Sequence, residues 1–251
     1  LQVDEVFIGA IYTVSALLFL IMSPVWGALS DRYGRRPLIV FGLSAFASSC
    51  LVFAAGAWAG QVGLLPPLAA IIAMAMARSI FGGLGSATNP AAQAYVADRT
   101  EPAERTRALS SLTAAFGLGT VIGPALAGFF SHRIGISTFM IAVAVMVAVA
   151  AVCVRLFLPE QTPPKKKGRP INPLVQFQFA GDPRLTAFMI YGCAMWMAQA
   201  ASLQSLSFYI MDRLGMDAAG GLQLGSIALT AGAAGLIFAQ LVVIPVLNTS
   251  P

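Results

Sequence analysis

Long runs of apolar residues, separated by short polar stretches, dominate this chain. Most runs hold about 20 residues or more, enough for a helix to cross the hydrocarbon core of a bilayer. They predict seven membrane-spanning helices, at residues 6–29, 38–59, 67–96, 107–130, 136–158, 185–210 and 220–246. The pattern therefore predicts an all-α membrane protein, with lipid around most of its outer side chains.

Composition and charge agree with that pattern and add an orientation. Hydrophobic residues make up 58% of the chain and charged residues 10%, against about 25% charged in an ordinary soluble domain. The net charge of +5 does not indicate nucleic-acid binding, because the basic residues lie between the apolar runs. Alternate loops carry Arg32, Arg35, Arg36, Arg99, Arg105, Arg107, Arg155, Lys165, Lys166, Lys167, Arg169 and Arg184, whereas the other connections carry only Arg133 and Arg213. Basic loops stay cytoplasmic, so we expect a multi-pass protein of the inner (plasma) membrane with these loops inside.

One long connection, rich in Pro and Lys, predicts a domain boundary. It divides an N-terminal helical bundle (1–158) from a cytoplasmic central linker (159–183) and the start of a C-terminal bundle (184–251). The Lys165–Lys167 run fits either a solvated linker or a contact with anionic lipid head groups. The chain opens with Leu1 and shows no signal peptide, so its start looks truncated.

The loop after the first run has a distinctive sequence, Gly27-Ala-Leu-Ser-Asp-Arg-Tyr-Gly-Arg-Arg-Pro37. Gly34 allows a tight turn, and Pro37 suits the first turn of the next helix. Asp31 and Arg35 are close enough in sequence to pair at the water interface, although one such pair adds little stability. A plain basic loop would meet the needs of topology, but it would not require this acid and these glycines.

This segment resembles the signature loop between helices two and three of the major facilitator superfamily. The resemblance implies that Asp31, Arg35 and Arg36, supported by Gly27, Arg32 and Gly34, form a charge network that latches the cytoplasmic side in the outward-open state. It also implies a partial chain, covering helices two to eight of a twelve-helix fold, with helix one missing.

The third run carries an arginine, Arg78, near the membrane midplane. A charge there is costly, so it should face a wet cavity, a partner or the backbone carbonyls of a neighbouring helix. Helical spacing puts Arg78, Gly82, Gly85 and Asn89 on one face, with Gln93 nearby. The pattern resembles the helix-four motif of the same family, whose arginine is linked to proton coupling. By the same resemblance Asp98, at the end of this run, joins the charge network; it could also be an ordinary interface charge.

The fourth run contains Gly117-Leu-Gly-Thr-Val-Ile-Gly-Pro-Ala-Leu-Ala-Gly128. Glycines four residues apart allow close helix packing, and Pro124 bends the helix. The string resembles the helix-five motif of the antiporter branch, in which Gly119, Gly123, Pro124 and Gly128 are defining positions; it departs in having Ala127 where glycine is usual. The resemblance implies export by exchange, while a packing face without mechanistic meaning remains possible.

The last two runs offer further candidates. Gly225, Ala228, Gly232 and Ala239 form a small-residue side that, by resemblance, packs against family helix five. Trp196, Gln199 and Ser202, together with Asn89 and Gln93, are candidates for a substrate cavity; ordinary bonding between helices would explain them as well.

Several kinds of chemistry find no support in the sequence. Cys50, Cys153 and Cys193 lie inside apolar runs and are read as packing residues, without a metal site or a disulfide. No arrangement of nucleophile, base and acid appears, so we do not expect the protein to be an enzyme. We also expect no cofactor, with the proton gradient as the energy source. No span has an Asp or Glu near its middle to carry the coupling proton.

Within the superfamily the chain resembles drug:proton antiporters of the tetracycline-efflux type. This implies proton-coupled efflux of small organic compounds by alternating access, by a protein that is a monomer when full length. The alternatives are a facilitator for a metabolite such as a sugar or an organic acid, and a non-transporting membrane protein such as a sensor or an inactive fragment. The chain by itself is expected to be inert.

Overall fold

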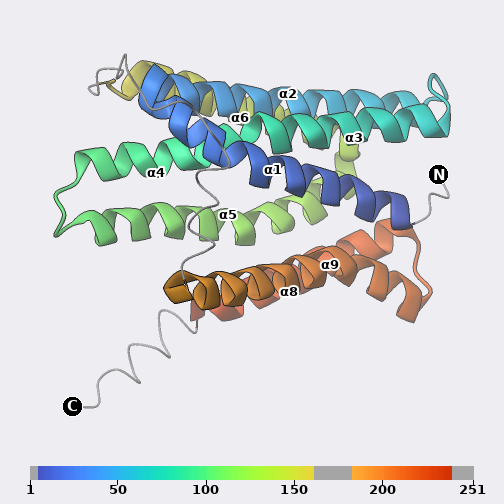
Figure 1. The fold of residues 1–251 in the computed structure, drawn as a ribbon. Coiled ribbons are helices and arrows are strands. Elements are labelled where there is room, and N and C mark those ends of the chain that lie inside the picture. The colour runs from blue at the N-terminus through green and yellow to red at the C-terminus, as the bar shows by residue number, and fades with distance from the viewer. Residues whose placement is uncertain (1–4, 161–182, 239–251) are drawn as a thin grey trace, which may run out of the picture. The chain divides into compact units, whose positions relative to one another are not determined.

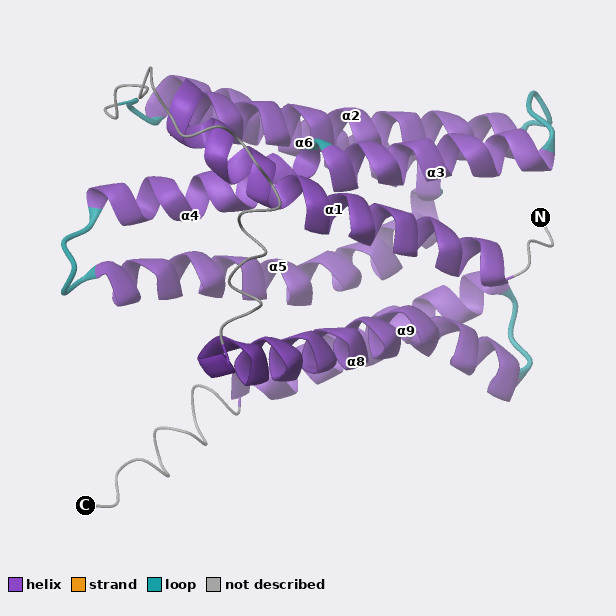
Figure 2. Ribbon diagram, in the orientation of Figure 1, coloured by secondary structure: helices purple, strands orange, loops and turns teal. Residues whose placement is uncertain are grey.

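The computed structural model describes residues 5–160 and 183–238, and within these ranges α-helices are joined by short connections (Figure 2). The helices follow the predicted apolar runs closely (Figure 1). They are α1 (Glu5–Tyr33), α2 (Arg35–Gln61), α3 (Pro67–Gly83), α4 (Thr88–Arg99), α5 (Arg105–Ile134), α6 (Ile136–Phe157), α8 (Pro183–Leu214) and α9 (Ala218–Phe238). The all-α prediction is confirmed.

Five helical segments of the described chain are long and apolar enough to cross a membrane. They are the helices at residues 9–33, 35–61, 67–99, 105–131 and 136–157. The sixth and seventh predicted spans are present as α8 and α9, and their crossing of the membrane stays a prediction.

The third predicted span differs from a single continuous helix. A short 3₁₀ turn, η1 (Gly85–Ala87), separates α3 from α4. Pro90 lacks the N–H that a continuous helix would need at this point, and nearby glycines weaken helix propensity. The Gly83 carbonyl, next to the interruption, accepts hydrogen bonds from Ser86 Oγ (3.0 Å) and from Trp26 Nε1 of α1 (2.7 Å). These bonds satisfy a backbone group that lipid could not satisfy.

The chain divides into two compact units, and the first comprises residues 1–110 and 136–178. In it α2 packs against α6 and α3, and α1 packs against α3 and α4. Many of the buried residues are small, as in membrane helices that approach closely. The buried cluster at one end is formed by Leu38, Ile39, Ala87, Ala91 and Tyr95. A Cβ on Gly42 of α2 would lie 2.6 Å from the backbone nitrogen of Thr88, so this crossing requires glycine.

The second unit comprises residues 111–135 and 179–251, so most of α5 is grouped with α8 and α9. α9 packs closely on α8, because a Cβ on Gly225 would collide with Ser207. The predicted domain boundaries stay predictions. Residues 161–182 of the predicted linker, with Lys165–Lys167, and Ala239 of the predicted small-residue side lie outside the described residues.

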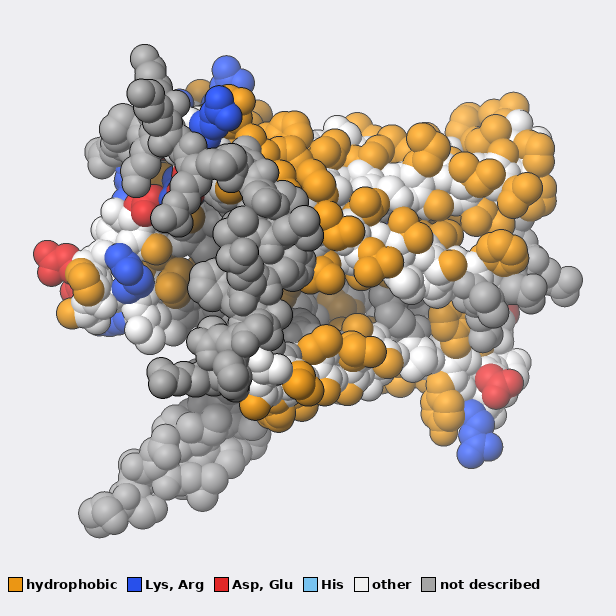
Figure 3. All heavy atoms as spheres, viewed as in Figure 1, with side chains coloured by type: hydrophobic (Ala, Val, Ile, Leu, Met, Phe, Trp, Pro, Cys, Tyr) orange, Lys and Arg blue, Asp and Glu red, His pale blue; other side chains and the backbone are white. Residues whose placement is uncertain are grey.

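The surface agrees with a membrane setting. Figure 3 shows hydrophobic side chains along the flanks of the described helices, with Lys, Arg, Asp and Glu near the helix ends. Large apolar side chains in the middle of helices are exposed, for example Val145 and Met146 of α6 at 57% and 61% exposure. Such exposure would be unfavourable in water and is expected for a helix that faces lipid.

Candidate functional site

The junction of α1 and α2 is set by one glycine. α1 ends at Tyr33 and α2 begins at Arg35, and Gly34 between them has φ 101°. An L side chain rarely adopts this conformation, whereas glycine does so at little cost. The Gly34 N–H donates to the Ser30 carbonyl at 3.1 Å. The chain therefore reverses direction within one residue, which brings the last turn of α1 beside the first turn of α2.

Arg35 is the centre of a charge cluster, which we define as Asp31, Arg35 and Asp98. Its guanidinium forms an ion pair with Asp31 of α1, and its Nε donates to Asp98 Oδ2 of α4 at 2.9 Å. It also donates to the hydroxyl of Ser30, which in turn donates to the Gly27 carbonyl at 2.7 Å. The cluster thus joins the ends of α1, α2 and α4.

Burial differs among the members of the charge cluster. The Arg35 side chain is 11% exposed, whereas Asp31 is 57% and Asp98 36% exposed. Water therefore screens both carboxylates, and the Asp31 pair contributes on the order of 1 kcal/mol or less. The arginine, with little access to water, depends on its protein partners. The cluster therefore joins three helix ends through ion pairs that are screened by water. Separating such pairs requires little free energy.

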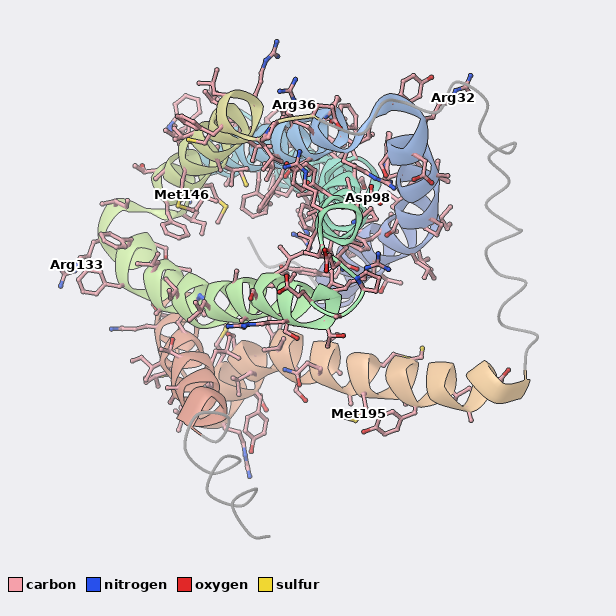
Figure 4. All side chains as sticks on the ribbon, turned by 90° about the vertical axis from the view of Figure 1, so that its left-hand side faces the viewer. Arg32, Arg36, Asp98, Arg133, Met146 and Met195 are labelled. Carbon is pink, nitrogen blue, oxygen red and sulfur yellow. The ribbon has the colours of Figure 1, made fainter. Side chains whose placement is uncertain are left out.

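Arg36 and Arg32 lie outside this cluster. Arg36 donates from its backbone N–H to Glu160 Oε2 at 2.7 Å, and its Nη1 donates to the Leu158 carbonyl at 3.3 Å. Arg32 lies over the ring of Tyr33, 5.8 Å from its centroid. Figure 4 places Asp98 among the helices and Arg32 at the outer edge of this end. The sequence groups these residues in one motif, and the structure gives them different partners.

The segment after α6 was missed by the sequence analysis. Besides its contacts with Arg36, it accepts hydrogen bonds at the Pro159 carbonyl from Tyr95 Oη (3.1 Å) and from Arg99 Nη2 (2.7 Å). Arg99 also lies over the Tyr95 ring at 4.3 Å. One signal could have found it: Glu160 is an acid that directly follows an apolar run, at the start of a stretch otherwise rich in lysine.

Arg78 lies in α3 among aromatic rings. Its guanidinium carbon is 4.8 Å from the ring centroid of Tyr12 and 5.2 Å from that of Phe81. Its Nε is buried and has no hydrogen-bond partner among the described residues. The Ser15 hydroxyl of α1 donates to the backbone carbonyl of Arg78 at 2.8 Å. The sequence analysis did not anticipate these aromatic faces, which attract a cation through their electron-rich centres.

The predicted polar stripe that begins at Arg78 and continues toward Asn89 is interrupted by η1. Gly82 and Gly85 stay near Arg78 in the chain, and a Cβ on Gly82 would collide with the Ser15 carbonyl of α1. Asn89 and Gln93 belong to α4, where Gln93 Nε2 donates to Asn89 Oδ1 at 3.1 Å. The two amides therefore bond to each other within one helix.

The helix-five motif forms one continuous helix that runs through Pro124. Its positions differ in packing within the second unit. A Cβ on Gly119 or Gly123 would meet none of the described atoms within 4 Å, whereas a Cβ on Gly128 would lie 2.8 Å from Ser226 Oγ of α9. The expected contact between α5 and α9 is thus formed through Ser226, and Gly225 faces α8 instead.

The cavity candidates in α8 have few described contacts. Ser202 donates to the Ala198 carbonyl of its own helix at 2.9 Å, and Gln199 is exposed. The side chain of Trp196 lies outside the described residues. In residues 5–160 and 183–238 no three His, Cys, Asp or Glu side chains could together hold a metal ion.

Comparison with known proteins places this geometry in context. The sequence profile of the Major Facilitator Superfamily matches residues 1–248. The chain is 27% identical over 163 residues to the multi-drug resistance efflux pump PmrA of Streptococcus pneumoniae serotype 4. The aligned region covers 65% of this chain and 38% of that protein. It is 28% identical over 185 residues to the class C tetracycline resistance protein of Escherichia coli. This alignment covers 72% of this chain and 43% of that protein.

Two further similarities extend the comparison. Major facilitator superfamily domain-containing protein 10 of Bos taurus is 30% identical over 175 residues, with 69% of this chain and 34% of that protein covered. The chain thus spans between 34% and 43% of the length of these curated relatives. The crystal structure of a D-xylose-proton symporter superposes with a TM-score of 0.57 at 19% identity, covering 93% of this chain and 58% of that one. This last similarity concerns the fold.

Proposed function

Because this chain belongs to the Major Facilitator Superfamily, we propose that it forms part of a secondary transporter that exports small organic compounds in exchange for protons. Members of this family move solutes across membranes and are not enzymes. The efflux reading is supported by the similarity to a multi-drug resistance efflux pump and to tetracycline resistance proteins. The substrate is an apolar or amphipathic drug-like compound, and the proton gradient supplies the energy.

The observation that carries this proposal is the charge cluster of Asp31, Arg35 and Asp98. Alternating access requires helix ends that close on one side of the membrane and separate again. The cluster joins three helix ends through one arginine and two partly exposed carboxylates. Such a contact is strong enough to favour a closed state and weak enough to open in each cycle. We assign it the role of a latch.

The orientation follows from the loops. The charge cluster lies at the end of the first unit where the basic loops gather, so this end is cytoplasmic by the positive-inside rule. The transporter then resides in the inner membrane and closes its cytoplasmic side when the latch forms. It works as a monomer and needs no cofactor.

Two interior features support coupling and exchange. Arg78 is the candidate for proton coupling, because a half-buried cation inside a span responds to any nearby carboxylate that gains or loses a proton. The contact of Gly128 with Ser226 gives α5 one glycine position at which α9 packs closely. Both features suit a bundle in which helices shift against one another around a central substrate.

The experiment is an export assay with the Asp31→Asn variant of the complete product of this gene. In inverted membrane vesicles with an imposed pH gradient, a panel of cationic and amphipathic drugs should discharge the gradient through the unaltered protein. Asp31→Asn should abolish this exchange, because the amide cannot balance Arg35, while membrane insertion stays intact. Glu101→Gln, an exposed acid in the loop after α4, is the matched control and should transport normally.

Two outcomes would overturn parts of this proposal. Normal efflux by Asp31→Asn would refute the latch assignment. If no drug discharges the gradient through the unaltered protein, while labelled sugars or organic acids equilibrate through it, the export function itself is wrong and a metabolite facilitator takes its place.

A further inference from the structure

Glu160, the last described residue after α6, makes an unusual contact with another helix. Its Oε2 accepts a hydrogen bond from the backbone N–H of Arg36, in the first turn of α2, at 2.7 Å. The first N–H groups of a helix have no partner inside the helix, and a carboxylate there also stabilises the helix dipole. Glu160 is 124 positions away in the chain, so this is a tertiary contact that serves as a helix cap.

The two residues before Glu160 strengthen the attachment. The Leu158 carbonyl accepts from Arg36 Nη1 at 3.3 Å, and the Pro159 carbonyl accepts from both Tyr95 and Arg99 of α4. We call Leu158, Pro159 and Glu160 the α6 clasp. It binds the start of α2 and the end of α4, which are two of the three helix ends that the charge cluster also joins.

The signature glycine is shaped for this contact as well as for the turn. A Cβ on Gly34 would lie 3.1 Å from Glu160 Oε2 and 3.3 Å from its Cδ, closer than ordinary contacts allow. The missing side chain therefore leaves room for the carboxylate to reach the α2 backbone. The other oxygen of Glu160, Oε1, is buried and has no hydrogen-bond partner among the described residues, so the Arg36 N–H is its principal attachment there.

We propose that Glu160 is a positioning residue of the latch, and that the α6 clasp and the charge cluster form and open together. Arg35 and Arg36 are neighbours in the first turn of α2. The Arg35 side chain reaches Asp31 and Asp98 only while that turn stays in place, and Glu160 holds the turn through the next peptide group. α6 is thereby coupled to the opening of the cytoplasmic side. This inference rests on the proposed transport function for its role, but its geometry can be tested separately.

The test measures amide hydrogen exchange and transport for Glu160→Ala in the complete product of this gene, reconstituted in lipid nanodiscs and in vesicles. Loss of a hydrogen bond to a charged group should speed exchange at the start of α2 by about 10- to 100-fold. If the clasp and the cluster are coupled, exchange should also rise at residues 27–33 and 95–99. The maximal transport rate should fall about tenfold with an unchanged KM, since Glu160 touches no substrate.

Two variants separate positioning from general damage. Glu160→Gln keeps a carbonyl oxygen that can accept from the Arg36 N–H, so it should recover most of the lost rate and protection. Tyr95→Phe removes one donor to the clasp and keeps the ring under Arg99; it should raise exchange in the same regions by a few fold. Glu101→Ala, at an exposed site on the same end of the unit, is the control and should change neither measurement.

Opposite results would overturn the inference in distinguishable ways. If Glu160→Ala raises exchange only at the start of α2 and leaves transport unchanged, Glu160 is a local cap and the proposal is wrong. If the unaltered protein exchanges no protons for any drug, the proposed function fails, yet the exchange pattern at residues 27–33 and 95–99 still decides whether the clasp is coupled to the cluster. Should Glu160→Ala fail to fold, Tyr95→Phe with unchanged exchange would refute the proposal.

Discussion

Arg35 and Arg78 belong to the same helical unit, but the groups that surround their charges differ. Arg35, at the end of a helix, contacts two carboxylates and a serine hydroxyl. Arg78, inside a span, lies close to the rings of Tyr12 and Phe81, and its Nε has no hydrogen-bond partner among the described residues. The first charge is neutralised by opposite charges near water, whereas the second, among the described residues, is attracted by aromatic faces and forms none of the ion pairs found there.

This difference separates stability from function. A charge that is well paired at an interface contributes to the folded state, because its removal leaves its partners unbalanced. A charge inside a membrane span that is not paired with a carboxylate lowers the stability of the folded protein. Such a residue is therefore expected to be there because the function needs it. Arg35 is therefore expected to stabilise the unit and Arg78 to destabilise it, although the proposed transport cycle needs both.

The largest effect should come from Arg78→Met, which replaces a charged side chain by an apolar one of similar length. Arginine at the centre of a membrane helix costs roughly 2.5–3.5 kcal/mol, and the aromatic rings return part of this through cation–π attraction. We expect the variant to be more stable by about 2 kcal/mol, while proton-coupled export is lost. Thermal unfolding in detergent and the vesicle assay measure the two quantities. A less stable variant would show that Arg78 has a stabilising partner besides the rings of Tyr12 and Phe81.

A smaller effect of opposite sign should follow from Arg35→Met. Asp31 and Asp98 would then face each other without a counter-charge, although both are partly exposed and screened. We expect the first unit to lose about 1–2 kcal/mol, measured by the same thermal unfolding. The loss should shrink at high salt, which screens exposed charges. Equal losses at low and high salt would mean that packing, and not charge, explains the contribution of Arg35.

The aromatic side of the comparison can be tested with Tyr12. Tyr12→Phe keeps the ring near Arg78 and should be neutral, whereas Tyr12→Leu removes the ring and should cost about 0.5–1 kcal/mol. In an Arg78→Met background the cost of Tyr12→Leu should disappear. A double-mutant cycle with thermal unfolding measures this coupling, and a coupling of zero would refute the cation–π account.

The smallest effect is expected at Arg32, a member of the same motif as Arg35. It is exposed at the edge of the unit and contacts only the ring of its neighbour Tyr33 among the described residues. Arg32→Gln should change stability by less than about 0.5 kcal/mol and leave export unchanged. A large loss of export would mean that Arg32 acquires partners in a state other than the one described.

The agreement between sequence and structure is closest where the signal is local. The apolar runs predicted the helices, since backbone groups in lipid must bond within their own helix. The Asp31 and Arg35 contact was also readable, because the two residues lie four positions apart around a glycine turn. The interruption by η1 was less accessible: a glycine-rich stretch and Pro90 weaken a helix, but membrane helices often tolerate both.

Contacts between distant segments were not readable in the same way. The resemblance to a known family suggested Asp98 as a partner of Arg35, and the structure places it there. Glu160 stands out locally as an acid beside a lysine-rich stretch, but its local sequence does not show which helix it contacts, and its partner lies 124 positions earlier. Likewise, the small-residue side predicted for α9 did not reveal that Ser226, rather than Gly225, meets Gly128.

The sequence by itself determined the elements, the family and the placement of charge at the helix ends, because these depend on the periodicity and spacing of neighbouring residues. The tertiary structure decided which helix ends are joined, that Arg35 and Arg36 have different partners, and that Arg78 lies close to two aromatic rings. The physical reason is that a helix fixes the positions of its own residues to within a turn. Which face meets which neighbour depends instead on close packing between small residues, and that packing is settled only when all the helices are assembled.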